Sequence, residues 1–276
     1  MRFPGAAIGP DAVLVWTGDR ELTRFSRDGA RASFTLPFTP LAARIGSDIV
    51  AVDDRGSVHR FTLAGENLGF LPLLESPGAI TRAAVSADGS RVAILTDEVQ
   101  VFAHGQLVPW SFEHRRHPGW RESGVDISAD GKCLLVHYVT FGGMNLGDDA
   151  EGFSITRADG VVLFRYFAQK LPPLEISMTH DARLVAICQH ENQVRLAETV
   201  SMAPLHRIEP VGHVQAMRFD GARLGVLFDY ELVIVDRTET RLVLPEQFDD
   251  FVICGSDAVC VHPELGAWWI KTAAAD

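Results

Sequence analysis

A short motif recurs along the chain, consisting of an apolar run, a tight turn rich in Asp, Gly or Ser, and a second apolar run. Its clearest copy is AVSADGSRVAIL at residues 84–95. Six further segments share the pattern: AAIGPDAVLVW (6–16), ARIGSDIVAVD (43–53), DISADGKCLLV (126–136), SMTHDARLVAI (177–187), MRFDGARLGVL (217–227) and VICGSDAVCVH (252–262). Gly, Asp and Ser tolerate the backbone angles of hairpin turns, so each copy predicts two antiparallel strands. Seven such hairpins indicate a repeat protein.

Most copies are followed by a third and a fourth strand-like run. Examples are ELTRFSRDG (21–29) with ARASFTLP (30–37), and ELVIVDRTE (231–239) with TRLVLPE (240–246). Alternation with a period of two residues dominates, as expected of strands. Four antiparallel strands recurring at intervals of roughly 40 residues are typical of a β-propeller blade. A β-sandwich, the alternative for an all-β chain, would need irregular connections in place of this single register.

We therefore predict one all-β domain over residues 1–276, a β-propeller with seven blades of four antiparallel strands. Stacking the blades in a ring buries both faces of each sheet. The expected blades are 1–39, 40–76, 77–114, 121–169, 172–210, 212–246 and 248–276.

One repeat carries a family resemblance. Residues 212–236, GHVQAMRFDGARLGVLFDYELVIVD, contain a Gly-His dipeptide at His213, an FDGARL turn and an Asp236 that closes the third strand. This pattern resembles the repeats of WD40 and related bacterial β-propeller proteins, which implies a propeller fold and a protein-binding scaffold. The Trp-Asp dipeptide of the family is absent, so the Asp-His-Ser-Trp hydrogen-bond network of that family is not carried over.

Composition narrows the function classes. The chain has 47% hydrophobic and 22% charged residues, which suits a packed core. Its net charge of −11 disfavours a general nucleic-acid ligand, because phosphate backbones are repelled. We recognise no secretory signal and no membrane-spanning run, and the four cysteines form no CxxC pair. These features predict a cytoplasmic protein without a membrane partner or a cofactor.

Closure of the ring is the first open question. The last repeat offers three strand-like runs and no fourth. Either the assignment of strands to blades is displaced by one strand, or residues 267–272 form an edge that bears Trp268 and Trp269. An exposed edge with two Trp residues invites a partner strand. Alternatively, one of the two packs between the last and first blades while the tail shields the other.

Two connections near the fourth repeat exceed the usual length, EHRRHPGWRES (113–123) and TFGGMNLGDDAEG (140–152). In a four-stranded blade both emerge on the same face. One carries His114, Arg115, Arg116, His117, Trp120 and Arg121, and the other carries Met144, Asn145, Asp148 and Asp149. The two either pair with each other electrostatically or form a patch that binds a partner protein, for which Arg and Trp are enriched.

No residue pattern identifies catalytic or metal-binding groups. Three acidic pairs, Asp53-Asp54, Asp148-Asp149 and Asp249-Asp250, are expected mainly as solvated turn residues. We therefore predict a non-catalytic scaffold or subunit of a larger assembly, which binds protein through one face near the fourth blade. The alternative is a propeller enzyme, a lactonase-like metal-dependent hydrolase with its site in the central channel.

Overall fold

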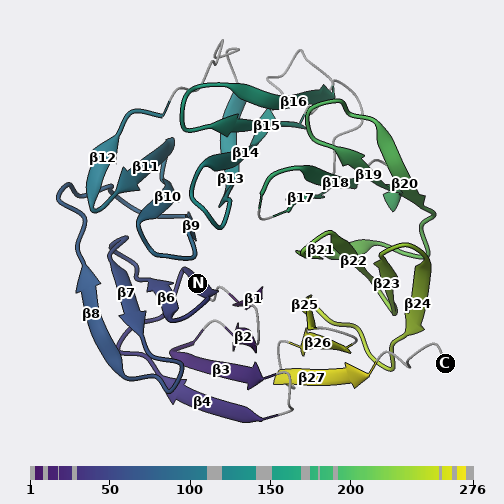
Figure 1. Cartoon of the computed structure of the whole chain (residues 1–276), viewed down its shortest axis with the longest axis horizontal. Coiled ribbons are helices and arrows are strands. Elements are labelled where there is room, and N and C mark those ends of the chain that lie inside the picture. The colour runs from purple at the N-terminus through teal and green to yellow at the C-terminus, as the bar shows by residue number, and fades with distance from the viewer. Residues whose placement is uncertain are drawn as a thin grey trace.

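Seven antiparallel sheets surround a central channel and form a β-propeller (Figure 1). The computed structural model describes residues 4–8, 12–17, 19–26, 30–110, 120–140, 151–168, 175–179, 181–188, 192–254, 257–262 and 266–271. In each sheet the strands follow one another in chain order, which confirms the predicted fold. The described residues contain no helix long and apolar enough to cross a membrane.

The blades are numbered in chain order. Blades one to three comprise β1 (Pro4–Ile8), β2 (Ala12–Thr17), β3 (Glu21–Ser26), β4 (Arg31–Thr35), β5 (Ala42–Ile45), β6 (Ile49–Val52), β7 (Val58–Phe61), β8 (Asn67–Leu71), β9 (Arg82–Val85), β10 (Arg91–Leu95), β11 (Val99–Ala103) and β12 (Gln106–Val108). Blades four and five comprise β13 (Trp120–Ile127), β14 (Cys133–Thr140), β15 (Glu151–Arg157), β16 (Val162–Ala168), β17 (Glu175–Met178), β18 (Leu184–Cys188), β19 (Val194–Glu198) and β20 (Pro204–Ile208). Blades six and seven comprise β21 (Val214–Asp220), β22 (Arg223–Phe228), β23 (Glu231–Val235), β24 (Glu239–Val243), β25 (Asp250–Cys254), β26 (Asp257–His262) and β27 (Gly266–Lys271).

The recurring turn owes its shape to side-chain hydrogen bonds. In blade three the Ser86 hydroxyl donates to the Asp88 carboxylate at 2.7 Å and accepts the Arg91 backbone N–H at 3.0 Å. The same arrangement recurs with Ser128, Asp130 and Cys133 in blade four, and with Thr179, Asp181 and Leu184 in blade five. The Asp-Gly step of the SADG copies places its Gly at positive φ, for example 70° at Gly89.

Apolar side chains fill the spaces between blades. A separate buried cluster lies between each pair of neighbouring blades, including the pair formed by blades seven and one. In that last cluster Val13, Val15 and Phe25 of blade one pack against Val252, Val259 and Val261 of blade seven. The ring therefore closes by side-chain packing between two blades that are each built from consecutive strands.

Blade seven has three described strands, in the order β25, β26, β27. Since β1 pairs with β2 inside blade one, the assignment of strands to blades is not displaced. The expected edge at Trp268 and Trp269 is therefore β27.

Blade four is longer than its neighbours. Its strands have seven or eight residues, whereas β9–β12 of blade three have three to five. Residues 120–123, expected in a connection, already belong to β13, and Glu151 and Gly152 belong to β15. Part of the extra sequence at this blade is thus extended sheet, which lengthens the blade at one end.

Candidate functional site

Most of the predicted partner-binding residues lie outside the described residues. These are His114, Arg115, Arg116, His117, Met144, Asn145, Asp148 and Asp149. Trp120 and Arg121 are the first two residues of β13, where their backbones pair with Thr140 and Val139 of β14. The prediction that this group binds a partner remains a prediction.

The strand register places both predicted connections at one end of blade four. Trp120, which follows the first connection, lies opposite Thr140, which precedes the second. Glu151, which follows the second connection, lies opposite Ala168 at the end of β16. We call this side of the ring the connection face, because it carries the links between blades and the turns from second to third strands. Antiparallel order brings the corresponding turns of every blade to the same side.

The connection face also exposes large apolar side chains in other blades. Val211 lies in the link from blade five to blade six, Tyr230 in the turn between β22 and β23, and Val243 at the end of β24. Leu74 is exposed in the link from blade two to blade three. Val243 retains 87% of its accessible surface, the largest exposed fraction among these four side chains.

A carboxylate organises the blade-six part of this face. Asp229 accepts hydrogen bonds from the His213 backbone N–H at 2.9 Å and from the Gln215 and Gln247 side-chain amides at 2.7 and 3.0 Å. These bonds, led by the His213 N–H, hold the pKa of Asp229 below its ordinary value. The His213 Nδ1 also lies 3.4 Å from the Asp229 carboxylate, a contact that the sequence pattern did not predict.

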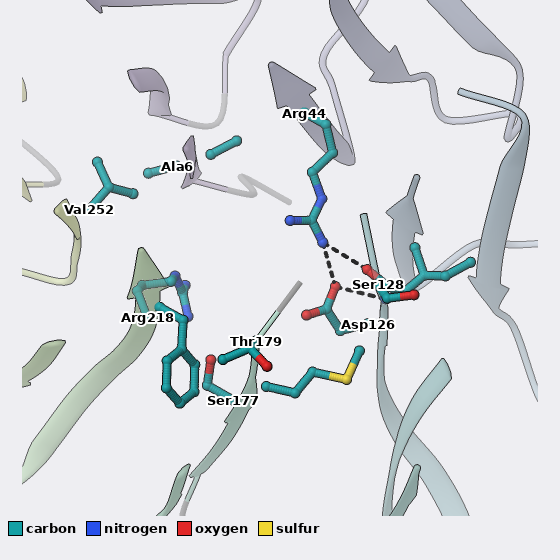
Figure 2. A pocket seen from close by; sticks show the side chains of 12 residues that line it. Ala6, Arg44, Asp126, Ser128, Ser177, Thr179, Arg218 and Val252 are labelled. Carbon is teal, nitrogen blue, oxygen red and sulfur yellow. Dashed lines mark hydrogen bonds and ion pairs between the residues drawn. The ribbon is translucent and has the colours of Figure 1, made fainter. Parts of the chain in front are cut away.

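One repeated position on the first strand of each blade faces the next blade near the ring centre, and by register it is occupied by Ala7, Arg44, Ala84, Asp126, Ser177, Arg218 and Val252. All of these except Ala84 line a central cavity. Figure 2 shows most of them around this cavity of about 70 Å³. A cavity of this size holds a few water molecules and is smaller than a typical metabolite pocket.

Arg44, one of the residues that line this cavity, links three blades. Its Nη2 lies 3.0 Å from the Asp126 carboxylate and 2.9 Å from the Ile127 carbonyl, both in blade four (Figure 2). Its Nε donates to the Val85 carbonyl of blade three at 3.2 Å. The guanidinium of a blade-two strand therefore joins blades three and four, as its several donors allow.

Arg218, on the first strand of blade six, likewise connects its two neighbouring blades, five and seven. Its Nη2 lies 3.0 Å from the Asp250 carboxylate of blade seven, and its Nη1 lies 3.7 Å from Glu175 of blade five. Burial raises the pKa of Glu175 to about 7, an effect that Asp250 reinforces and that Arg218 and the Met217 N–H oppose. Glu175 is thus a carboxyl that changes protonation near neutral pH.

Two of the acidic pairs depart from the sequence expectation. Asp250 and Asp53 are buried rather than solvated. Asp53 accepts N–H groups of Arg55 and Ser57 and lies 3.0 Å from the His59 ring. Burial alone would raise the pKa of Asp53, but these bonds hold it below its ordinary value. Within the described ranges, no three His, Cys, Asp or Glu side chains gather as metal ligands would.

Sequence reasoning did not find Arg44, Arg218 or Glu175. The available signal was their place in the repeat, because Arg44 and Arg218 stand at the same position of ARIGSD and MRFDGA, where the DISADG copy carries Asp126 and the remaining copies carry Ala, Ser or Val. A charged residue in a strand that borders a channel needs a partner on another blade. That partner lies too far away in sequence for a local pattern to reveal it.

Comparison with known proteins bears on the fold. No protein-family model matches the chain, and no curated protein matches it in sequence. Among 1169 matching chains of solved structures is one from the "Crystal Structure of Mitotic Checkpoint Complex", with a TM-score of 0.64 and 10% identity. The match covers 98% of this chain and 86% of that one. A fold shared so widely at such low identity leaves function open, and the chain has the fold of a WD40-like β-propeller.

Proposed function

We propose that this protein is a non-catalytic propeller scaffold that binds a partner protein through its connection face. The observation that carries the proposal is the exposure of Leu74, Val211, Tyr230 and Val243 on the face from which both blade-four connections leave. Apolar and aromatic side chains in such positions commonly form the centre of protein interfaces. The resemblance of the fold to a propeller found in a protein complex is consistent with this role.

The residues of the two connections add chemistry to this proposal. Arg115, Arg116 and Trp120 are of the types that dominate binding energy at interfaces, and they precede or begin β13. The acidic surface implied by the net charge of −11 favours a partner with basic residues around the apolar contacts.

A channel-sited hydrolase receives less support. Three described carboxylates on first strands, Asp126, Glu175 and Asp250, each lie within 4 Å of an arginine. Metal-bound carboxylates would have to exchange these partners for a cation. We further propose a cytoplasmic location, since Cys133 and Cys260 are free thiols.

Site-specific photo-crosslinking in the native cell tests the interface. A photoreactive amino acid at Tyr230 or at Arg116 is expected to yield the same protein adduct. The matched control is Val200, which is 78% exposed in the turn between β19 and β20 on the opposite face. An adduct at Val200 alone, or none at Tyr230 and Arg116, contradicts the assignment of the connection face.

Substitution of residues in and beside the first connection is a second test of the interface. The triple variant Arg115→Ala, Arg116→Ala, Trp120→Ala should lose association with the cross-linked partner at least tenfold while its thermal unfolding stays cooperative. Unchanged association in a folded triple variant removes the blade-four connections from the interface.

A further inference from the structure

Among the described residues, no strand lies at the outer edge of β27, the position that a fourth strand occupies in the other six blades. There, β4, β8, β12, β16, β20 and β24 each pair antiparallel with the third strand of their blade. Within the described residues, β27 pairs with β26 alone. Every second residue of such a strand turns its N–H and C=O groups outward.

We propose that this edge docks one antiparallel strand supplied by a partner protein. This interface is separate from the connection face and stands without it. The six complete blades indicate what the docked strand looks like, because they show three to seven residues in the same position. Main-chain hydrogen bonds would supply affinity, and alternate side chains would supply specificity.

The complete blades also define the side chain that the docked strand must bring. Each fourth strand places at least one apolar residue in or against the cluster shared with the next blade, namely Phe34, Leu71, Val108, Leu163 with Phe164, Ile208 and Leu242. The cluster between blades seven and one has no such contributor among its described residues. The docked strand therefore needs a Leu, Ile, Val or Phe that faces blade one.

Aromatic side chains lie on both sides of this edge strand. Trp269 faces blade one, where its ring centroid lies 6.2 Å from that of Phe25, and its Nε1 donates to Asp257 at 3.0 Å. On the other side Trp268 is 40% exposed and meets Phe248 edge to face at 6.0 Å. Cross-strand pairs with Trp are among the more stabilising contacts in sheets.

The charged side chains near this edge also indicate which charges the docked strand should carry. Arg31, whose guanidinium lies 5.6 Å from the Phe25 ring centroid, and Lys271 are both exposed. They favour a partner strand with acidic residues beside its apolar ones.

A synthetic peptide with the sequence of residues 236–246, DRTETRLVLPE, is a suitable probe, since it copies the fourth strand of blade six and carries three acidic residues. The readout is amide hydrogen exchange of residues 266–271 in the full chain. We expect about tenfold slower exchange at alternate residues when the peptide is bound. The same peptide with Thr240→Pro should have no effect, because proline removes a strand donor.

To exclude weak affinity as an explanation, the peptide is also fused behind residue 276 through a Gly/Ser linker, which raises its effective concentration. The fusion should raise the melting temperature relative to the fusion with Thr240→Pro in its peptide. Equal melting temperatures together with unchanged exchange overturn the proposal.

Two further outcomes overturn it in favour of another occupant. Protection without peptide that grows with protein concentration identifies a second copy at the edge. Protection that is lost on deletion of residues 272–276 identifies the chain's own tail.

Discussion

Arg44 on the first strand of blade two forms an ion pair with Asp126 on the first strand of blade four, with Nη2 and Oδ1 3.0 Å apart. The contact passes blade three, whose Val85 carbonyl accepts a hydrogen bond from the same guanidinium. Blade three carries Ala84 at the equivalent position, where it is buried in the cluster between blades three and four. The Arg44 guanidinium therefore connects blade two to blades three and four.

Arg44→Met should lower the free energy of unfolding by about 1–2 kcal/mol, because it removes three hydrogen bonds and leaves Asp126 without this partner. The Asp126 side chain is 42% exposed, so we set this value below that of a fully buried pair. The matched control is Arg60→Met, which removes the exposed Arg60–Asp48 pair of the same blade and should cost less than about 0.5 kcal/mol. Urea unfolding measures both, and equal losses would contradict a special role for the channel pair.

Glu175→Gln should change how stability depends on pH. The folded pKa of Glu175, about 7, lies above its ordinary value of 4.5, so the folded state binds more protons than the unfolded state between these values. Stability from this group is present below pH 4.5 and is lost as pH rises toward 7. The variant should lack that loss. At pH 8 its free energy of unfolding should therefore exceed that of the native protein by on the order of 2 kcal/mol.

Unfolding by urea at pH 5 and pH 8 checks this prediction. Glu122→Gln changes another partly buried glutamate on a first strand and serves as the matched control. Identical pH profiles for the native protein and Glu175→Gln would show that Glu175 is ionised throughout this range.

The repeat could be predicted from the sequence because its determinants are local. A Ser, an Asp and a Gly within four residues define the turn at Ser86, and the alternation on either side defines the strands. Strand ends in blade four could not be predicted in the same way. Trp120 to Ser123 read as a polar connection, and only pairing with β14 makes them a strand, since β preference depends on neighbouring strands.

The channel contacts were out of reach for a different reason. Arg44 and Asp126 are 82 residues apart, and Arg218 and Asp250 are 32 apart. Nothing near either arginine in sequence specifies its partner, because the ring geometry brings the strands together. The same holds for Asp250, which reads as one of two adjacent turn carboxylates but begins an inner strand.

The recurring turn makes a prediction for acid stability. Asp130 accepts hydrogen bonds from the Ser128 hydroxyl at 2.7 Å and the Lys132 N–H at 3.0 Å. Burial alone would raise the pKa of Asp130, but these bonds hold it below its ordinary value of 3.8. Its contribution to stability is therefore present above pH 3.8 and is lost as pH falls through the lowered pKa.

Asp130→Ala should lower the free energy of unfolding by about 1 kcal/mol at pH 7 and by progressively less below pH 4. Asp97→Ala is the control, since Asp97 is an exposed turn residue of blade three. Thermal unfolding at pH 7 and pH 3 separates the two. A loss for Asp130→Ala that is the same at both pH values would mean that the carboxylate charge does not support the turn.

A buried hydrogen bond at the start of the blade-four connection provides the last prediction. Trp110, the last described residue before that connection, donates its Nε1 to the Thr156 hydroxyl at 2.9 Å, and both side chains are buried. Trp110→Phe and Thr156→Val should each lower the free energy of unfolding by about 1–2 kcal/mol. Each variant removes one partner of the buried hydrogen bond and leaves the other partner without it. Since each variant breaks the same bond, the double variant should cost about 1 kcal/mol less than the sum. A double-mutant cycle in urea measures this coupling, and strictly additive losses would show that the bond contributes nothing. If the bond also orients the connection, Trp110→Phe should weaken partner binding more than a variant of equal stability loss in blade one, such as Val15→Ala.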